Sequence, residues 1–359
     1  MTTINLLSSR PTPSFAAPAQ PVYEPAPNAS SALVRSLTAT QAEAINEALS
    51  NSLSENSRRS YASCLRQFTA WCLMQEGIDT DDKATMFSPL VVTTYLVMLS
   101  GHASPKTVEV ARAAILNAAG PYKAALSASE PLKQALRGCR RAARGYVASK
   151  APALSREDIL KAAQAVAVLS TVAAARDHAI YTLGLSGALR SSDLVNLIWS
   201  DVTFVEEGIE LRIRFSKSSL NECTLPIASL SETAQNQVLS AVKSVKKYMH
   251  LVEVFEGKQA DDSPLFRSVR KGGYALGGAL SPSAITPILR NLLRAGGVEN
   301  PEQYSSHSLR STAATTASRQ GFSLDSIMRL ARWETPSVAL GYFRHEKWEN
   351  PASAWLGAE

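Results

Sequence analysis

The sequence predicts a mainly α-helical protein that folds as two domains, with one small antiparallel sheet in the second. Its 359 residues exceed what one ordinary hydrophobic core organises, and a hydrophobic content of 45% supplies enough apolar side chains for two. Over most of the chain, apolar residues recur at spacings of three and four, the period of an amphipathic helix. Strict alternation, which is typical of a half-buried strand, is found at 209–215.

Charge and cysteine content indicate a polyanionic partner and a reducing compartment. Lys and Arg outnumber Asp and Glu by 37 to 31, a net charge of +6, which suits nucleic acid. The cysteines form no C-x-x-C pair, so neither a zinc site nor a disulfide framework is expected, and a cytoplasmic location is favoured. Apolar runs are too short to span a membrane and the N-terminus does not resemble a signal peptide, so we expect no membrane partner.

The first part of the chain predicts a tail and a helical domain. Residues 1–34 hold six of the 18 prolines and show no hydrophobic period, which predicts a disordered tail. Residues 35–148 show helical spacing, and Ser54, Ser88 and Ser104 precede apolar runs as helix caps. The expected helices span 38–51, 55–76, 88–100, 105–118 and 129–145.

Arginines gather on two of these helices. Arg58 and Arg59 lie off the apolar stripe of the second helix, toward solvent or a partner. On the last helix four arginines recur at i, i+3, i+4 and i+7, and such a face repels itself unless anions neutralise it. A solvated basic face is the alternative interpretation. These four are Arg137, Arg140, Arg141 and Arg144.

A linker at 149–154 separates the second domain, 155–345, because Pro152 stops helix formation and Ser155 can cap a new helix. Helices are then expected at 155–168, 171–186, 231–255 and 281–295.

Three features of this domain carry chemistry. Arg190 follows a turn at Gly187, and Asp193 lies close enough to brace its guanidinium; a surface ion pair is the ordinary alternative. The strand at 209–215 and a returning strand at 223–227 predict a β-hairpin whose loop carries Lys217; a solubilising surface lysine is the ordinary alternative. The helix at 281–295 presents Ser283, Thr286 and Arg290 on one side, and Pro287 leaves its start open between Ser281 and the residue after Thr286.

The stretch 305–345 brings together four groups that can hold or attack a phosphodiester. His307 and Arg310 share one helix face at i and i+3, and this helix ends at Gly321. A second helix at 323–332 ends before Trp333, and a short link leads to Tyr342. Taken singly, each has an ordinary alternative: a capping or surface histidine, a core tryptophan, a packing tyrosine.

Together these residues resemble a known family. H-S-L-R at 307–310, Trp333 and L-G-Y-F-R at 340–344 resemble the C-terminal signature of the tyrosine recombinases, the λ-integrase family. G-A-L-R-S-S-D-L at 187–194 resembles their first arginine box, and the run at 54–72 resembles the opening helix of their core-binding domain. A-R-W-E-T stands where many integrases read L-G-H-S-S, and this tryptophan is most similar to Cre-type enzymes.

The resemblance implies a two-domain DNA clamp, with a helical core-binding domain and an α-rich catalytic domain. It implies a site-specific recombinase that cuts and rejoins DNA through a 3′-phosphotyrosyl bond, without metal or other cofactor. Tyr342 would be the nucleophile and Lys217 the general acid. Arg290 would read a base in the major groove. The phosphate would be held by Arg190, His307, Arg310 and Trp333, with Asp193 in support.

The partner implied is double-stranded DNA with an inverted-repeat site, bound by a dimer per site and a homotetramer on two sites. The tail 346–359 would dock on a neighbouring subunit, with docking on its own core as the alternative. Two other functions share parts of this pattern: a type IB topoisomerase, and a non-catalytic DNA-binding protein. The complete set of six catalytic residues argues against the latter, and the arginine-rich helical domain with the tail argues against the former.

Overall fold

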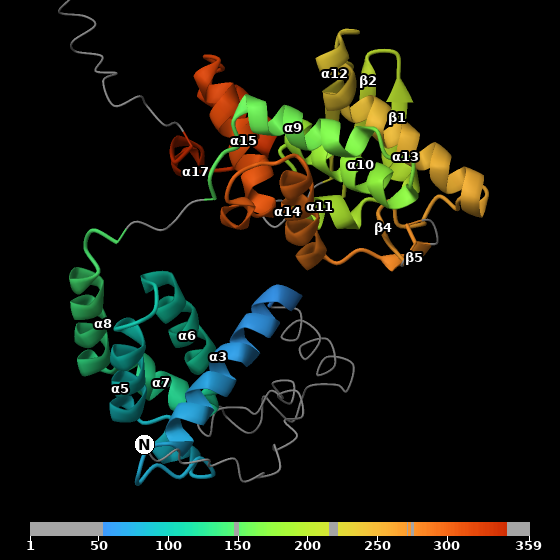
Figure 1. Ribbon diagram of the computed structural model, residues 1–359. Helices are drawn as coiled ribbons and strands as arrows, with labels where there is room; N and C mark the ends of the chain where they lie inside the picture. Colours follow the sequence, from blue (N-terminus) through green and yellow to red (C-terminus); the bar gives the residue numbers. More distant parts are fainter. Residues whose placement is uncertain (1–52, 147–150, 215–221, 271, 274–275, 343–359) are drawn as a thin grey trace, which may run out of the picture. The chain divides into compact units, whose positions relative to one another are not determined.

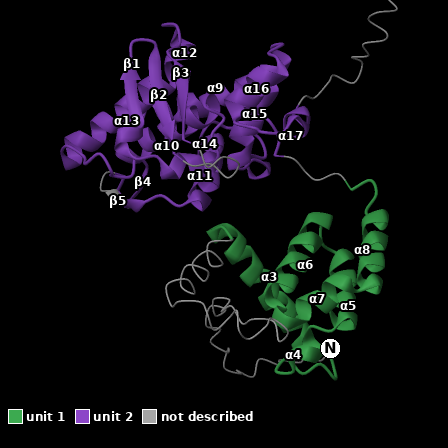
Figure 2. Ribbon diagram, turned by 180° about the vertical axis from the view of Figure 1, so that it is seen from behind, with its two compact units in different colours: residues 1–148 green, residues 149–359 purple. Residues whose placement is uncertain are grey.

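The computed structural model describes residues 53–146, 151–214, 222–270, 272–273 and 276–342 (Figure 1). Two compact units divide the chain at residue 148 (Figure 2). The expected tails at 1–34 and 346–359, the helix at 38–51 and the loop with Lys217 lie outside the described residues.

The first unit is a helical bundle. Serine caps begin its longer helices as predicted, since the Oγ atoms of Ser54, Ser88 and Ser104 each accept a backbone N–H of the first turn. Phe68, Leu96 and Ile115 are buried in its core. Its helices are α3 (Glu55–Leu73), α4 (Lys83–Met86), α5 (Pro89–Ser100), α6 (Pro105–Ala118), α7 (Lys123–Ala128) and α8 (Glu130–Ala142).

Two details of the first unit differ from the sequence prediction. The short helices α4 and α7 were not expected, because four and six residues are too few to show a period. Helix α8 ends at Ala142, and Arg144 lies in the following turn, where its N–H donates to the carbonyl of Arg141. The fourth arginine is therefore not on the helix.

The second unit is built around one buried helix. Eleven residues of α10 (Val172–Ser186) are buried, on every side of the helix. Four helices pack around it, namely α9 (Arg156–Ala167), α13 (Ala241–Glu256), α14 (Ile285–Ala295) and α15 (Ser306–Arg319) (Figure 1). The remaining α-helices are α11 (Ser191–Asn196), α12 (Ala234–Leu239), α16 (Leu324–Ala331) and α17 (Pro336–Leu340).

The predicted hairpin is present within a three-stranded antiparallel sheet of order β1-β2-β3. Strand β2 (Gly208–Ile213) pairs with β3 (Cys223–Ala228), and β1 (Val202–Val205) adds an edge that was not predicted. The pairs Ile209↔Ile227 and Leu211↔Leu225 bury their side chains in the core. A second small hairpin, β4 (Arg267–Val269) and β5 (Leu276–Ala279), was also not predicted.

The helix expected at 231–255 is in fact two helices. Ser240 has an extended ψ of 111°, and its Oγ accepts the N–H of Lys243 as the cap of α13. Apolar spacing continues across this break, so the pattern alone did not reveal it. At 281–295, a 3₁₀ turn (Pro282–Ala284) precedes α14, which begins at Ile285. Pro287 therefore lies in the first turn, where its missing N–H costs no intrahelical bond.

None of the helices in the described ranges is both long enough and apolar enough to cross a membrane.

The close approach of β2 to β3 at Gly208 gives a test of this register. A methyl group added there would lie 2.1 Å from the carbonyl oxygen of Ile227. We expect Gly208→Ala to lower the free energy of unfolding by about 2 kcal/mol, as overpacking does, measured by thermal melting. Gly278→Ala is the matched control, because a methyl group there meets no atom within 4 Å. Equal melting of both variants would contradict this register.

Candidate active site

The segment between α10 and α11 places Arg190 beside a buried carboxylate. The chain turns at Ala188, whose φ is 45°, whereas the expected turn residue Gly187 has an ordinary φ of −95°. Asp193 Oδ2 accepts the backbone N–H of Arg190 at 3.1 Å and lies 4.0 Å from Arg190 Nη1. The Asp193 side chain is 1% exposed and that of Arg190 is 20% exposed. Arg190 can therefore be reached from solvent while its carboxylate neighbour cannot.

Arg310, one turn into α15, is held on several sides. Its Nη1 donates to the carbonyl of Ala188 at 2.7 Å, and its Nη2 donates to the carbonyl of Ala331. Its guanidinium carbon lies 5.0 Å from the ring centre of Trp333, a cation–π distance. Burial, together with the positive charges of Arg190 and Arg332, lowers the pKa of Arg310 to about 9. Positive charges are therefore gathered near one another at this site.

Arg332 joins this cluster, although the sequence did not single it out. Its Nη2 donates to Asp193 Oδ2 at 2.9 Å and its Nη1 to the carbonyl of Gly187 at 3.2 Å. A basic residue near the C-terminus of a helix is common, so no local signal marked Arg332 as part of a site.

Trp333 connects Arg310 to Tyr342. The indole is buried in a small cluster with Ala188, Ile327 and Ala339. The ring of Tyr342 stacks on it, with ring centres 4.7 Å apart and planes 18° apart. Tyr342 lies just after the end of α17, and its backbone N–H donates to the carbonyl of Ala339 in that helix. The phenol is thus positioned through the same indole that contacts Arg310.

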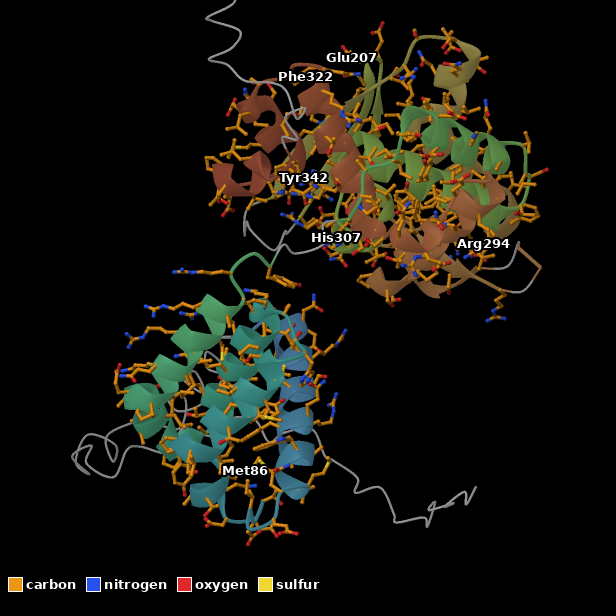
Figure 3. The ribbon with its side chains drawn as sticks, turned by 60° about the vertical axis from the view of Figure 1, so that its left-hand side comes forward. Met86, Glu207, Arg294, His307, Phe322 and Tyr342 are labelled. Carbon is orange, nitrogen blue, oxygen red and sulfur yellow. The ribbon has the colours of Figure 1, made fainter. Side chains whose placement is uncertain are left out.

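His307 is the second residue of α15 and its side chain is exposed. Ser305 caps this helix, and Ser308 Oγ accepts the N–H of Ser305 in return. Figure 3 shows His307 and Tyr342 in the second unit. Of the predicted catalytic set, the structure links Arg190, Arg310, Trp333 and Tyr342 by successive contacts that begin at Asp193, while His307 lies at the solvent-exposed start of the Arg310 helix.

The residues predicted to contact DNA from the helix expected at 281–295 are engaged within the protein, and Ser283 lies in the 3₁₀ turn before α14 rather than on the helix. Arg290 donates to the carbonyls of Tyr304 and Glu302, at 2.9 and 2.7 Å. Thr286 Oγ1 accepts the N–H of Ser306, which fixes the start of the His307 helix. Ser283 is exposed and pairs with the hydroxyl of Ser281. To read a base, Arg290 would have to release these carbonyls.

The arginines of the first unit differ in their pairing. Arg58 and Arg59 both lie beside Glu55. Arg137 pairs with Glu130 and Arg140 with Glu109. Arg141 and Arg144 are exposed, and neither forms an ion pair with an acidic residue of the described ranges.

Comparison with known proteins identifies a relative and solved structures of the same fold. A curated relative described as an integrase/recombinase XerD homologue of Selenomonas ruminantium is 26% identical over 302 residues, which cover 82% of this chain and 83% of the relative. The XerH site-specific recombinase, in a post-cleavage complex with a palindromic difH substrate, shares the fold with a TM-score of 0.58 at 17% identity, over 90% of this chain and 86% of that one. A λ integrase dimer bound to a COC′ core site gives 0.53 at 16% identity, over 86% and 96%.

The sequence model of the phage integrase family matches residues 154–349. This range contains α9 through α17 and every residue of the cluster around Asp193. Because the match covers more than half of the chain's residues, the chain belongs to the phage integrase family and is a tyrosine-type site-specific DNA recombinase.

Proposed function

We propose that the cluster around Asp193 binds the scissile phosphate of DNA and that Tyr342 attacks it. The observation that carries this proposal is a chain of contacts between separate elements. Arg190 lies beside the buried carboxylate of Asp193, Arg310 donates to the carbonyl of Ala188 in the turn before Arg190, and the Trp333–Tyr342 stack lies against the Arg310 guanidinium. Several guanidinium charges surround a single carboxylate there, so the site favours an added anion. A phosphodiester supplies that charge and matches the planar fork of a guanidinium.

The chemistry is a pair of transesterifications. The phenol oxygen of Tyr342 attacks the phosphorus, the bond to the 5′ oxygen breaks, and a 3′-phosphotyrosyl bond and a 5′-hydroxyl result. The phenolic proton leaves with the help of His307, and Lys217 protonates the departing 5′ oxygen. The free 5′-hydroxyl of another strand then reverses the step. Each bond broken is replaced by one of similar energy, so the reaction needs no ATP, metal or other cofactor.

The described contacts support different roles for the phosphate-binding groups. The carbonyls of Ala188 and Ala331 fix the Arg310 guanidinium before substrate arrives, so little reorganisation is needed. Arg190 is the more exposed arginine and can approach a non-bridging oxygen directly. Trp333 would donate its indole N–H to the same phosphate while its ring supports Tyr342.

The proposed partner is double-stranded DNA with an inverted-repeat site that binds one protomer on each half. The λ integrase dimer on its core site and XerH on difH support a DNA partner and a dimer per site. Assembly of a homotetramer on two sites, with the tail 346–359 docked on a neighbour, is the further proposal. Similarity to Cre-type enzymes likewise stays a prediction, which is based on Trp333.

Replacing the nucleophile tests the central step. We expect Tyr342→Phe to bind DNA with unchanged affinity but to form no covalent adduct, because only the phenol oxygen is lost. Denaturing gels on nicked suicide substrates of a mapped site would show this. Tyr304→Phe is the matched control, since Tyr304 is buried near α15 and should be dispensable for attack. An adduct that persists in Tyr342→Phe would assign the nucleophile elsewhere.

The arginines at the end of the first unit should supply affinity that does not depend on sequence. We expect Arg141→Gln with Arg144→Gln to weaken binding to specific and random DNA alike, and to reduce the slope of log K against log salt by about 2. Arg137→Gln with Arg140→Gln should reduce it less, because Glu130 and Glu109 already neutralise those residues. Filter binding across a salt series measures both. A loss confined to the specific site would indicate base reading instead.

A further inference from the structure

Two consecutive helices of the second unit end in the same hydrogen-bonded motif, but with different residues at its left-handed position. After α15, Gly321 has φ 79°, and the N–H groups of Gly321 and Phe322 donate to Ser318 and Ala317. After α16, Arg332 has φ 50° and ψ 52°. Its N–H and that of Trp333 donate to Arg329 and Met328. Glycine is favoured at this position because it carries no Cβ, so Arg332 requires a compensating interaction.

The side chain of Arg332 provides that interaction. Its side chain is 11% exposed, and its guanidinium donates to Asp193 Oδ2 and to the carbonyl of Gly187, 139 and 145 residues away in sequence. A buried carboxylate requires a cation or hydrogen bonds, and Asp193 receives both from this side chain. Asp193 Oδ2 also accepts the backbone N–H of Arg190. Arg332 therefore holds both ends of the segment 187–190. It binds the carbonyl of Gly187 directly, and it binds the N–H of Arg190 through Asp193.

The segment that Arg332 holds is itself conformationally strained. Ala188 has φ 45°, and its carbonyl accepts from Arg310. Among residues with described placement, the non-glycine residues with positive φ are Ala188, Asn300 and Arg332. Ala188 and Arg332 both belong to the site, where Arg332 donates to the carbonyl of Gly187, the residue before Ala188. The left-handed end of α16 and the left-handed turn before Arg190 therefore stabilise each other. Strain of this kind persists where surrounding contacts over-determine the conformation.

We propose that Arg332 is a positioning residue for strand cleavage. By clamping Asp193 and Gly187 it fixes the backbone that carries Arg190, and it couples that backbone to the end of α16, from which Trp333 and then Tyr342 follow. Arg332 does not touch the substrate. This inference rests on the proposed role of Arg190 in holding the scissile phosphate.

The decisive variant is Arg332→Gly. Glycine suits the left-handed position, so the end of α16 and the place of Trp333 should be kept while the clamp is lost. We expect covalent adduct formation on a nicked substrate to slow by about tenfold to a hundredfold in single turnover, with DNA affinity unchanged and the melting temperature within a few degrees of the wild type. Millimolar guanidinium ion should restore part of the rate, because it can occupy the vacated place beside Asp193.

Three further variants complete the test. Arg332→Lys keeps a charge beside Asp193 but cannot donate through a planar fork, so its rate should lie between those of the wild type and Arg332→Gly. Arg329→Ala removes an exposed arginine of the same helix, paired with Asp325. Asn300→Gly relieves the backbone strain of a non-glycine residue with positive φ outside the cluster. Both should cleave at the wild-type rate.

The outcomes separate the inference from the proposed function. If the wild type forms an adduct and Arg332→Gly forms it equally fast, the positioning role is wrong and the proposed function stands. If Arg332→Gly melts far below the wild type and guanidinium restores no activity, Arg332 is purely structural and the inference is again wrong. If the wild type forms no adduct, or Tyr342→Phe still forms one, the proposed function itself fails.

Discussion

The second unit depends on one buried charge, the carboxylate of Asp193. With its side chain 1% exposed, it requires cations around it, and the chain supplies them from α16 and from the turn before α11. Asp193 thereby connects the end of α16, through Arg332, to the turn before α11, through Arg190. The same principle recurs at Asp201, also 1% exposed, where Arg212 of β2 and Arg214 just after this strand both donate to Oδ1 at 3.0 Å. In the Asp193 cluster, however, the guanidinium groups outnumber the carboxylate, which favours the binding of the proposed phosphate.

Aromatic packing connects this charge cluster to Tyr342, the proposed nucleophile. Trp333 contacts the guanidinium of Arg310 and the ring of Tyr342. Because its indole belongs to the hydrophobic cluster with Ala188 and Ala331, the groups proposed to bind phosphate and the group proposed to attack it share one packed support. A change in the turn at Ala188 would therefore affect both.

Much of this could be predicted from the sequence, for identifiable reasons. Helix starts followed from serines before apolar runs, as at Ser54 and Ser88, and the end of α15 followed from Gly321. The hairpin β2–β3 followed from strict alternation. Arg190, Arg310, Trp333 and Tyr342 were expected to act together from the resemblance of their motifs, and the structure places them around one site. Lys217 lies outside the described residues, so its role stays a prediction.

What the sequence did not predict depends on contacts between distant residues. The break between α12 and α13 needs the cap at Ser240, which is one polar residue in a continuous apolar period. Strand β1 is an exposed edge with little alternation. The carbonyl partners of Arg290 and the clamp by Arg332 are set by tertiary contacts. The turn at Ala188 was expected at Gly187, because a glycine is the usual left-handed residue.

Arginine side-chain NMR tests most directly whether this cluster is a preformed phosphate receptor. In the free protein, the guanidinium signals of Arg310 and Arg332 should be sharp and slow to exchange with water, because their nitrogens are buried and bonded. On adding DNA that contains a mapped site, the signals of Arg190 and Arg310 should shift while that of Arg332 stays. Signals broadened by exchange in the free protein, or a shift of Arg332 as large as that of Arg190, would contradict the account.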